Sequence, residues 1–175
     1  MKKIAILILI SMIHIGTKSQ DLDNLDKKMG FNKFKLESSY EVYKSKLTYE
    51  MTGSDKVDYY KYSDTDIFSV FGVIIGKITL GFYKGKLYTI SIEFINIDSD
   101  EIKIQNELQE LFGRQEIQYN SKYGEFEYDW VMNWVSKNVY LELDKLSCSG
   151  KIYPCTLELY MISKKIRAEI KNDSF

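Results

Sequence analysis

Apolar and polar residues alternate along several short stretches of the chain, and this alternation predicts β-strands. Residues 77–83 and 87–94 alternate on either side of Lys84 and Gly85. That dipeptide suits a tight turn because glycine tolerates positive φ, so the pair forms the clearest predicted hairpin. Further strands are expected at residues 57–62, 68–75, 126–134, 139–144 and 156–161.

Two other segments have helical spacing. Ser38 and Glu41 fit a capping box, which predicts a helix from Ser38 to about Leu47. A second helix is expected to start at Asp98 and to stop at Gly113, because glycine often ends a helix. Its apolar stripe consists of Ile104, Leu108, Leu111 and Phe112.

The predicted order is a helix followed by about three strands, and it occurs twice. The two halves run roughly over residues 31–96 and 97–165. Short turns between the strands predict antiparallel meanders. Two helices cannot cover both faces of the sheet, so one face is expected to carry the helices and the other to be partly open. The prediction is one α+β domain over residues 20–175, with a charged tail that frays from Lys164.

The segment 30–41 (GFNKFKLESSYE), the segment 108–113 (LQELFG) and the closing hairpin resemble small exported proteins typical of Bacteroidetes. The tandem layout of helix and meander is also similar to β-lactamase-inhibitor-protein-like folds and to small outer-membrane assembly lipoproteins. This resemblance implies a binding or assembly module. The assembly lipoproteins carry a lipidated cysteine, and no cysteine stands near the N-terminus of this chain.

The N-terminus has the pattern of a secretory signal peptide. Lys2 and Lys3 precede an apolar run over residues 4–15, which is shorter than the roughly 20 residues of a membrane span. Thr17 and Ser19 supply small residues before a cut, so residues 1–19 are expected to be removed. An uncleaved anchor and a buried N-terminal strand are the alternatives. The prediction is a periplasmic or secreted protein with no stable membrane span after cleavage.

Removal of residues 1–19 takes away three lysines and no acids, which leaves 21 basic against 25 acidic residues and a formal charge of −4. An acidic chain with scattered lysines argues against nucleic-acid binding. The removed segment also contains His14, the sole histidine. A Ser–His–Asp triad and His-ligated metal sites are therefore excluded from the mature chain. No phosphate loop or calcium loop is present, and no metal or cofactor is expected.

The two cysteines, Cys148 and Cys155, flank a predicted turn that contains Gly150 and Pro154. A metal site needs more ligands, and a redox pair usually has two intervening residues at a helix start. Exported proteins meet oxidising conditions. A disulfide that closes this small loop is the preferred interpretation.

Three carboxylates at alternating positions, Glu125, Glu127 and Asp129, could serve as acid and base on a glycan. The aromatic residues between and after them, Tyr128, Trp130 and Trp134, point to the opposite face. The favoured interpretation places the acids in solvent and the aromatics in the core, and an extracytoplasmic glycan hydrolase remains the alternative.

Tyrosine is frequent, with 14 residues, and tyrosine is enriched at binding interfaces. Several tyrosines and glutamates lie opposite the inward-facing aliphatics of their strands. The expected role is a non-enzymatic module that binds an envelope or secreted protein through this open face, and an immunity-type protein that neutralises a toxin is a further alternative. The candidate face consists of Tyr83, Tyr140, Tyr160, Glu93, Glu142 and Glu158.

Overall fold

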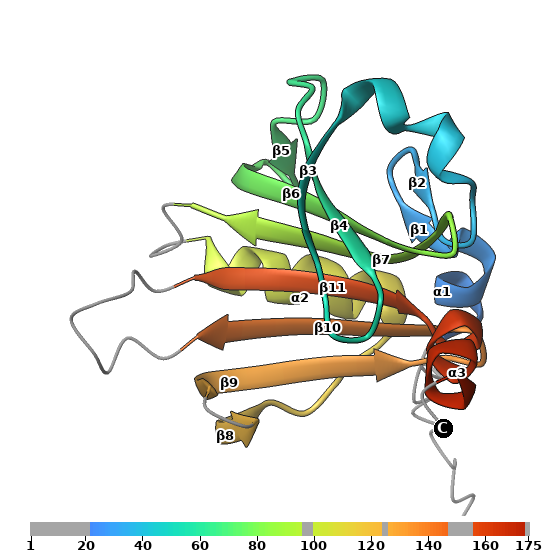
Figure 1. Ribbon diagram of the computed structural model, residues 1–175. Coiled ribbons are helices and arrows are strands. Elements are labelled where there is room, and N and C mark those ends of the chain that lie inside the picture. Colours follow the sequence, from blue (N-terminus) through green and yellow to red (C-terminus); the bar gives the residue numbers. More distant parts are fainter. Residues whose placement is uncertain (1–21, 96–99, 124–125, 147–155, 174–175) are drawn as a thin grey trace, which may run out of the picture.

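An antiparallel sheet with helices packed against it makes this an α+β structure (Figure 1). The computed structural model describes residues 22–95, 100–123, 126–146 and 156–173, and the side chains of residues 121–127 are outside this set. The strand order is β3-β4-β6-β7-β11-β10-β9-β8, and β5 pairs with β6.

The bounds of the elements are as follows. The large sheet contains β3 (Leu47–Thr52), β4 (Asp58–Tyr62), β5 (Ser69–Val70), β6 (Val73–Tyr83), β7 (Lys86–Phe94), β8 (Gln118–Tyr123), β9 (Phe126–Val135), β10 (Val139–Leu146) and β11 (Leu157–Ser163). A second, two-stranded sheet pairs β1 (Gly30–Phe31) with β2 (Phe34–Lys35). The helices are α1 (Leu22–Lys28), α2 (Glu101–Phe112) and α3 (Lys164–Asn172).

The sheet joins two meanders at its centre. Each of β8, β9 and β10 pairs with the next strand in the chain, up to β11. Strand β11 then pairs with β7, the last strand of the other meander, and this places Ile92 opposite Leu159. Among the described residues, no helix is long and apolar enough to cross a membrane.

The inner face of the sheet forms the main core with α1 and α2. On β10, Val139, Leu141 and Leu143 are fully buried, as their alternation predicts. The indole of Trp134 is also fully buried, and its Nε1 donates to the carbonyl oxygen of Gly113 at 2.7 Å. This bond ties β9 to the end of α2, so side chains from both halves of the chain share one core.

The predicted hairpin and the second predicted helix are confirmed. Strands β6 and β7 pair across Lys84 and Gly85, whose φ angles are 47° and 72°. Two consecutive positive φ angles characterise the tight turn that matches the twist of a hairpin. Helix α2 ends at Gly113, where φ is 87°. The helix begins at Glu101, after Asp100, and not at the expected Asp98, which lies outside the described residues.

The helix predicted from Ser38 is wrong. The chain forms two short 3₁₀ turns, Tyr40–Val42 and Lys44–Lys46, and then enters β3. The segment before the turns is held to β7: Glu37 N–H donates to the Leu87 carbonyl at 2.7 Å, and Leu87 N–H donates to the Ser38 carbonyl at 2.8 Å. The Ser38 hydroxyl donates to the Lys35 carbonyl at 2.5 Å, and Ser39 caps the first 3₁₀ turn instead by accepting from Glu41 N–H.

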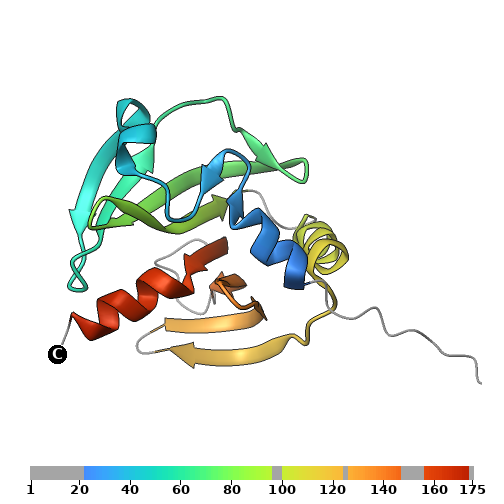
Figure 2. The same cartoon turned by 90° about the vertical axis from the view of Figure 1, so that its right-hand side faces the viewer.

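Two further predictions are wrong. The tail was expected to fray from Lys164, and all helices were expected to pack on one face of the sheet. Residues 164–172 form α3, whose first turn is capped by the Ser163 hydroxyl. Ile166 and Ile170 pack on Val57, Tyr83 and other residues of a second cluster on the outer face of the sheet. Figure 2 shows α1 and α2 on one side of the sheet and α3 on the other.

Candidate functional site

The outer face of the sheet is partly enclosed by neighbouring elements. In Figure 1 the hairpin of β3 and β4 passes in front of β7 and β11. The loop after β3 packs against α3 through Val57. Between the hairpin and the sheet lies a hollow of about 190 Å³, which we call the tyrosine hollow. Its lining consists of Asp55, Tyr59, Thr79, Tyr88, Thr89, Ser91, Tyr160 and Ile162.

A β-bulge and a glycine shape the tyrosine hollow. Gly81 lies opposite Thr89 and Phe82 lies opposite Leu87, so Tyr88 is the extra residue of the bulge. Extra residues in bulges re-aim their side chains, and Tyr88 accordingly joins the outer cluster. A Cβ atom on Gly81 would lie 2.6 Å from Thr89 and 3.0 Å from Tyr59. Glycine at this position therefore permits the close approach of Tyr59 to the sheet.

The tyrosine hydroxyls in the hollow remain protonated at neutral pH. Burial, together with Asp55, raises the pKa of Tyr59 to about 12. Burial also raises the pKa of Tyr88. The pKa of Tyr160 is raised by burial and by the neighbouring Glu158. The hollow thus offers neutral hydroxyls and aromatic faces to a ligand.

Three carboxylates stand in register beside the hollow. Asp144 on β10 lies opposite Glu158 on β11, and Glu158 lies opposite Glu93 on β7. We call these three residues the carboxylate ladder. Like charges directly opposite each other destabilise a sheet. Part of this cost is offset because the Ser91 hydroxyl, which lines the hollow, donates to Glu158 Oε1 at 2.5 Å.

Asp144 is the buried end of the ladder. Only 2% of the residue is exposed, and its Oδ2 has no hydrogen-bond partner among the described residues. Burial, and then the charges of Glu158 and Glu142, raise the pKa of Asp144 to about 8. The carboxyl is therefore mostly protonated in the folded protein at pH 7. The strand pattern assigns Asp144 to the outer face, but its burial depends on tertiary packing that the pattern does not contain.

The residues of the predicted binding face have different surroundings. Tyr160 lines the tyrosine hollow, and Glu158 and Glu93 belong to the carboxylate ladder. Tyr140 is half-buried on the same face, where its hydroxyl donates to Glu142 and the Arg167 guanidinium lies 5.7 Å from its ring centroid.

Tyr83 does not belong to an open face. It is 3% exposed beneath α3, and its hydroxyl donates to Asp173 at 2.5 Å. The expectation of exposure fails because the tail that was predicted to fray covers this side chain.

The proposed hydrolytic carboxylates are only partly described. The side chains of Glu125 and Glu127 lie outside the described residues, whereas Asp129 is half-buried. Trp130 and Trp134 are in the inner core, as expected. Cys148 and Cys155 also lie outside the described residues. Within the described parts of the chain, no group of three or more potential ligands could hold a metal ion.

Two tyrosines outside the predicted binding face complete the site. Tyr59 and Tyr88 lie in predicted strands, but alternation alone does not bring them near Tyr160. The bulge at Tyr88 and the position of the β3–β4 hairpin over the sheet bring the three side chains together. Searches against family models, curated proteins and solved structures find no match to the chain.

Proposed function

We propose that the protein is a non-enzymatic binding module that recognises a basic segment of a partner protein on its outer sheet face. An arginine or lysine side chain of the partner would enter the tyrosine hollow. Its cation would be attracted by the aromatic faces and by the nearby carboxylates. Its aliphatic stem would pack against the rings.

The observation that carries this proposal is the carboxylate ladder beside the tyrosine hollow. Glu158 and Glu93 lie opposite each other on adjacent strands at the centre of the sheet, where their repulsion opposes folding, and the neighbouring Asp144 is buried at a cost in free energy. Groups that break a local stability rule in this way are often placed for function. Ser91 connects the ladder to the hollow, since it lines the hollow and binds Glu158. A basic side chain is the ligand that satisfies both features.

The test is affinity capture from an envelope extract of the source organism, with the purified protein as bait. We expect the wild-type protein to retain a specific partner that elutes as salt is raised, because exposed charge interactions are screened. The double substitution Tyr59→Ser and Glu158→Gln should lower the retained amount by roughly ten-fold, since buried aromatic and charged contacts dominate interface energies.

The matched control is Tyr49→Ser, which changes a tyrosine on β3 that is 56% exposed and does not line the hollow. This variant should retain the partner as the wild type does. Specific capture of polysaccharide without any protein would count against the proposal. Undiminished capture by the folded double variant would refute the assignment to the hollow.

We propose further that the protein is exported and carries a disulfide between Cys148 and Cys155. The support is the charged and apolar pattern of residues 1–19 and the presence of only two cysteines. Non-reducing mass spectrometry of the protein from its native host should give a chain that begins at Gln20 and lacks two thiol hydrogens. Two free thiols, or an uncut N-terminus, would contradict the respective parts of this proposal.

The tandem arrangement remains a proposal, together with the resemblance to inhibitor-protein-like folds. It is supported by the two meanders, whose last strands β7 and β11 pair at the centre of the sheet. The 3₁₀ turns at Tyr40–Val42 and Lys44–Lys46 occupy the place of a helix in the first half, so the halves differ there.

The other functions make different predictions in the same capture experiment. An immunity-type protein would retain a toxin domain, which would specify the partner within the proposed class. A glycan hydrolase needs carboxylates that converge in a cavity. Of the residues that line the tyrosine hollow, Asp55 is the carboxylate. The geometry of the described residues therefore favours binding.

A further inference from the structure

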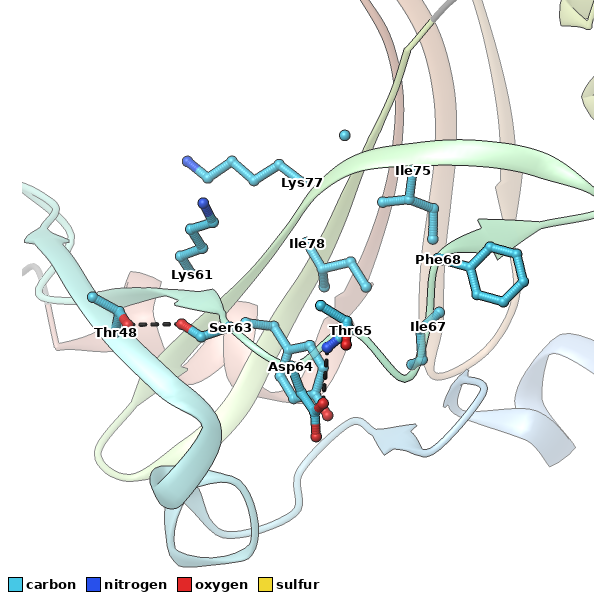
Figure 3. Close-up of a pocket in the computed structure, with 12 residues that line it drawn as sticks. Thr48, Lys61, Ser63, Asp64, Thr65, Ile67, Phe68, Ile75, Lys77 and Ile78 are labelled. Carbon is cyan, nitrogen blue, oxygen red and sulfur yellow. Dashed lines mark hydrogen bonds between the residues drawn. The ribbon is translucent and has the colours of Figure 1, made fainter.

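A second and larger hollow lies where β4 and β6 separate. The two strands pair from Asp58 opposite Phe82 to Lys61 opposite Thr79, and the pairing stops there. Further along β6, β5 pairs only with Val73 and Ile74. Between these points the segment 63–68 bows away from β6 and leaves a hollow of about 460 Å³ (Figure 3). This volume is within the range of small-molecule sites, which is about 300 to 1,000 Å³.

One end of this hollow, which we call the lysine hollow, is apolar. Ile78 is 4% exposed, and Ile67 and Ile75 are half-buried. Phe68 borders this end and is 72% exposed. Figure 3 shows Phe68, Ile67 and Ile75 together, away from the lysine side chains. A large aromatic ring left in solvent beside a hollow offers additional apolar surface to a ligand.

The opposite end of the lysine hollow is cationic. The side chains of Lys61 and Lys77 extend into the same region in Figure 3. Lys77 Nζ lies 2.8 Å from Glu50, so its charge is balanced. Among the described residues, Lys61 has no ion-pair partner. The hydroxyls of Thr48 and Ser63 lie 2.7 Å apart at the same rim and add hydrogen-bonding groups.

The one acid in the lining does not oppose this positive charge. Asp64 forms an ion pair with Lys46, and Figure 3 shows its carboxylate pointing away from Lys61 and Lys77. The contact with Lys46 holds the pKa of Asp64 below its usual value. The lining therefore carries one positive charge that no carboxylate in the described parts of the chain balances, and this charge lies at the polar end of an apolar hollow.

We propose that the lysine hollow binds a small amphipathic monoanion, a carboxylate with a short aliphatic chain. The carboxylate would lie between Lys61 and Lys77, within reach of the hydroxyls of Thr48 and Ser63. The chain would extend over Ile78 and Ile75 towards Phe68. One unbalanced charge selects a monoanion, because a second negative charge would find no partner. This site is separate from the tyrosine hollow, and it does not depend on the function proposed for that hollow.

The test is titration of the purified protein with octanoate, followed by backbone NMR shifts and calorimetry. We expect saturable binding with the largest shifts at residues 61–68 and 75–78. The substitution Lys61→Gln keeps most of the side-chain stem and removes the charge, so it should weaken the octanoate affinity by roughly three- to ten-fold. The substitution Phe68→Ser should weaken it through the loss of apolar contact.

Two controls separate this site from nonspecific binding. Lys171→Gln removes an exposed lysine from the last turn of α3 and should leave the octanoate affinity unchanged. Octylamine, which has the same number of carbons and the opposite charge, should bind at least ten-fold more weakly. Equal affinities of the wild type and the folded Lys61→Gln variant would overturn the proposal. So would shifts that map to another part of the protein, or the absence of saturation. None of these results bears on partner capture by the tyrosine hollow.

Discussion

The two faces of the sheet are formed by the same strands but carry different kinds of side chains. On β10 the inner face presents Leu141 and Leu143, which are fully buried beneath the helices. The outer face of the same strand presents Tyr140, Glu142 and Asp144. Every inner residue gains free energy from burial, whereas Asp144 loses it because its carboxyl is desolvated. The inner face therefore specifies the fold, and the outer face carries groups whose placement stability does not explain.

The largest expected effect on stability comes from a cavity-forming substitution in the inner face. Leu141→Ala should lower the free energy of unfolding by about 3 to 5 kcal/mol, because the side chain is fully buried and a cavity would remain. Urea denaturation measures this difference. Its matched control is Tyr140→Ala on the same strand, which should cost roughly half as much or less because Tyr140 is half-buried. Equal costs would mean that both faces contribute alike.

The second-largest expected effect on stability concerns the packing of α3 on the outer face. Ile166→Ala should cost about 2 to 3 kcal/mol, because Ile166 is 1% exposed in the cluster around Tyr83. Amide hydrogen exchange should show faster exchange over residues 164–172. The neighbouring Lys165→Ala should change stability by less than about 0.5 kcal/mol, since Lys165 is exposed. If α3 is not held to the sheet, the two variants will behave alike.

Asp144 should give the outer face a pH dependence of its own. Its pKa is about 8 in the folded protein against an ordinary value of 3.8, so the folded state binds more protons than the unfolded state between these values. This contribution to stability is complete below the unfolded pKa and is lost as the pH rises towards the folded pKa. The free energy of unfolding should therefore decrease as the pH rises, by roughly 1 kcal/mol per pH unit.

The variant Asp144→Asn removes this titration. The stability of the wild type and of the variant should be compared by urea denaturation at about pH 5 and pH 7.5. The variant should gain stability relative to the wild type at the higher pH. A constant difference across this window would show that Asp144 is charged in the folded protein. The measurement thus tests whether the carboxylate ladder is as desolvated as its position indicates.

The smallest expected effect lies on the inner side, at the end of the sheet. Asp26 of α1 accepts hydrogen bonds from the Ser136 hydroxyl at 2.6 Å and from Asn138 N–H at 2.9 Å. Burial alone would raise the pKa of Asp26, but these bonds and that from Lys137 N–H hold it below 3.8. Asp26→Asn should cost about 1 kcal/mol near pH 7.

For Asp26 the pH dependence has the opposite sign to that of Asp144. A carboxyl with a lowered pKa stabilises the fold above its unfolded pKa, and this contribution is lost as the pH falls through the folded value. The cost of Asp26→Asn should therefore shrink below about pH 4. A cost that is the same at about pH 3 and pH 7 would mean that the charge of Asp26 contributes nothing.

The sequence predicted the elements that local pattern determines. The hairpin around Gly85 and the helix that ends at Gly113 were correct, because turn chemistry and apolar period agree in both. The helix from Ser38 failed because the pairing of this segment with β7 overrides its capping pattern. Helix α3 was missed because its apolar stripe consists of only Ile166 and Ile170 among polar residues. The cap at Ser163 was a signal that could have revealed it.

The candidate site was predictable in part. Alternation placed Tyr160, Glu158 and Glu93 on the outer face, because two-residue periodicity needs no tertiary information. The covering of Tyr83, the bulge at Tyr88 and the burial of Asp144 depend on how distant segments meet. A single sequence contains no local pattern for such contacts.

The pairing of β7 with β11, which we call the joint between the two meanders, has a consequence for how the chain folds. Within each meander the paired strands are close in sequence, but the joint brings together residues such as Ser91 and Glu158, which are 67 positions apart. Closure of so long a loop costs chain entropy before any contact across the joint forms. We therefore expect the meanders to form early and their union to set the folding rate. The ladder residues Glu158 and Glu93 face each other across this joint, so the repulsion between them acts at the slowest step.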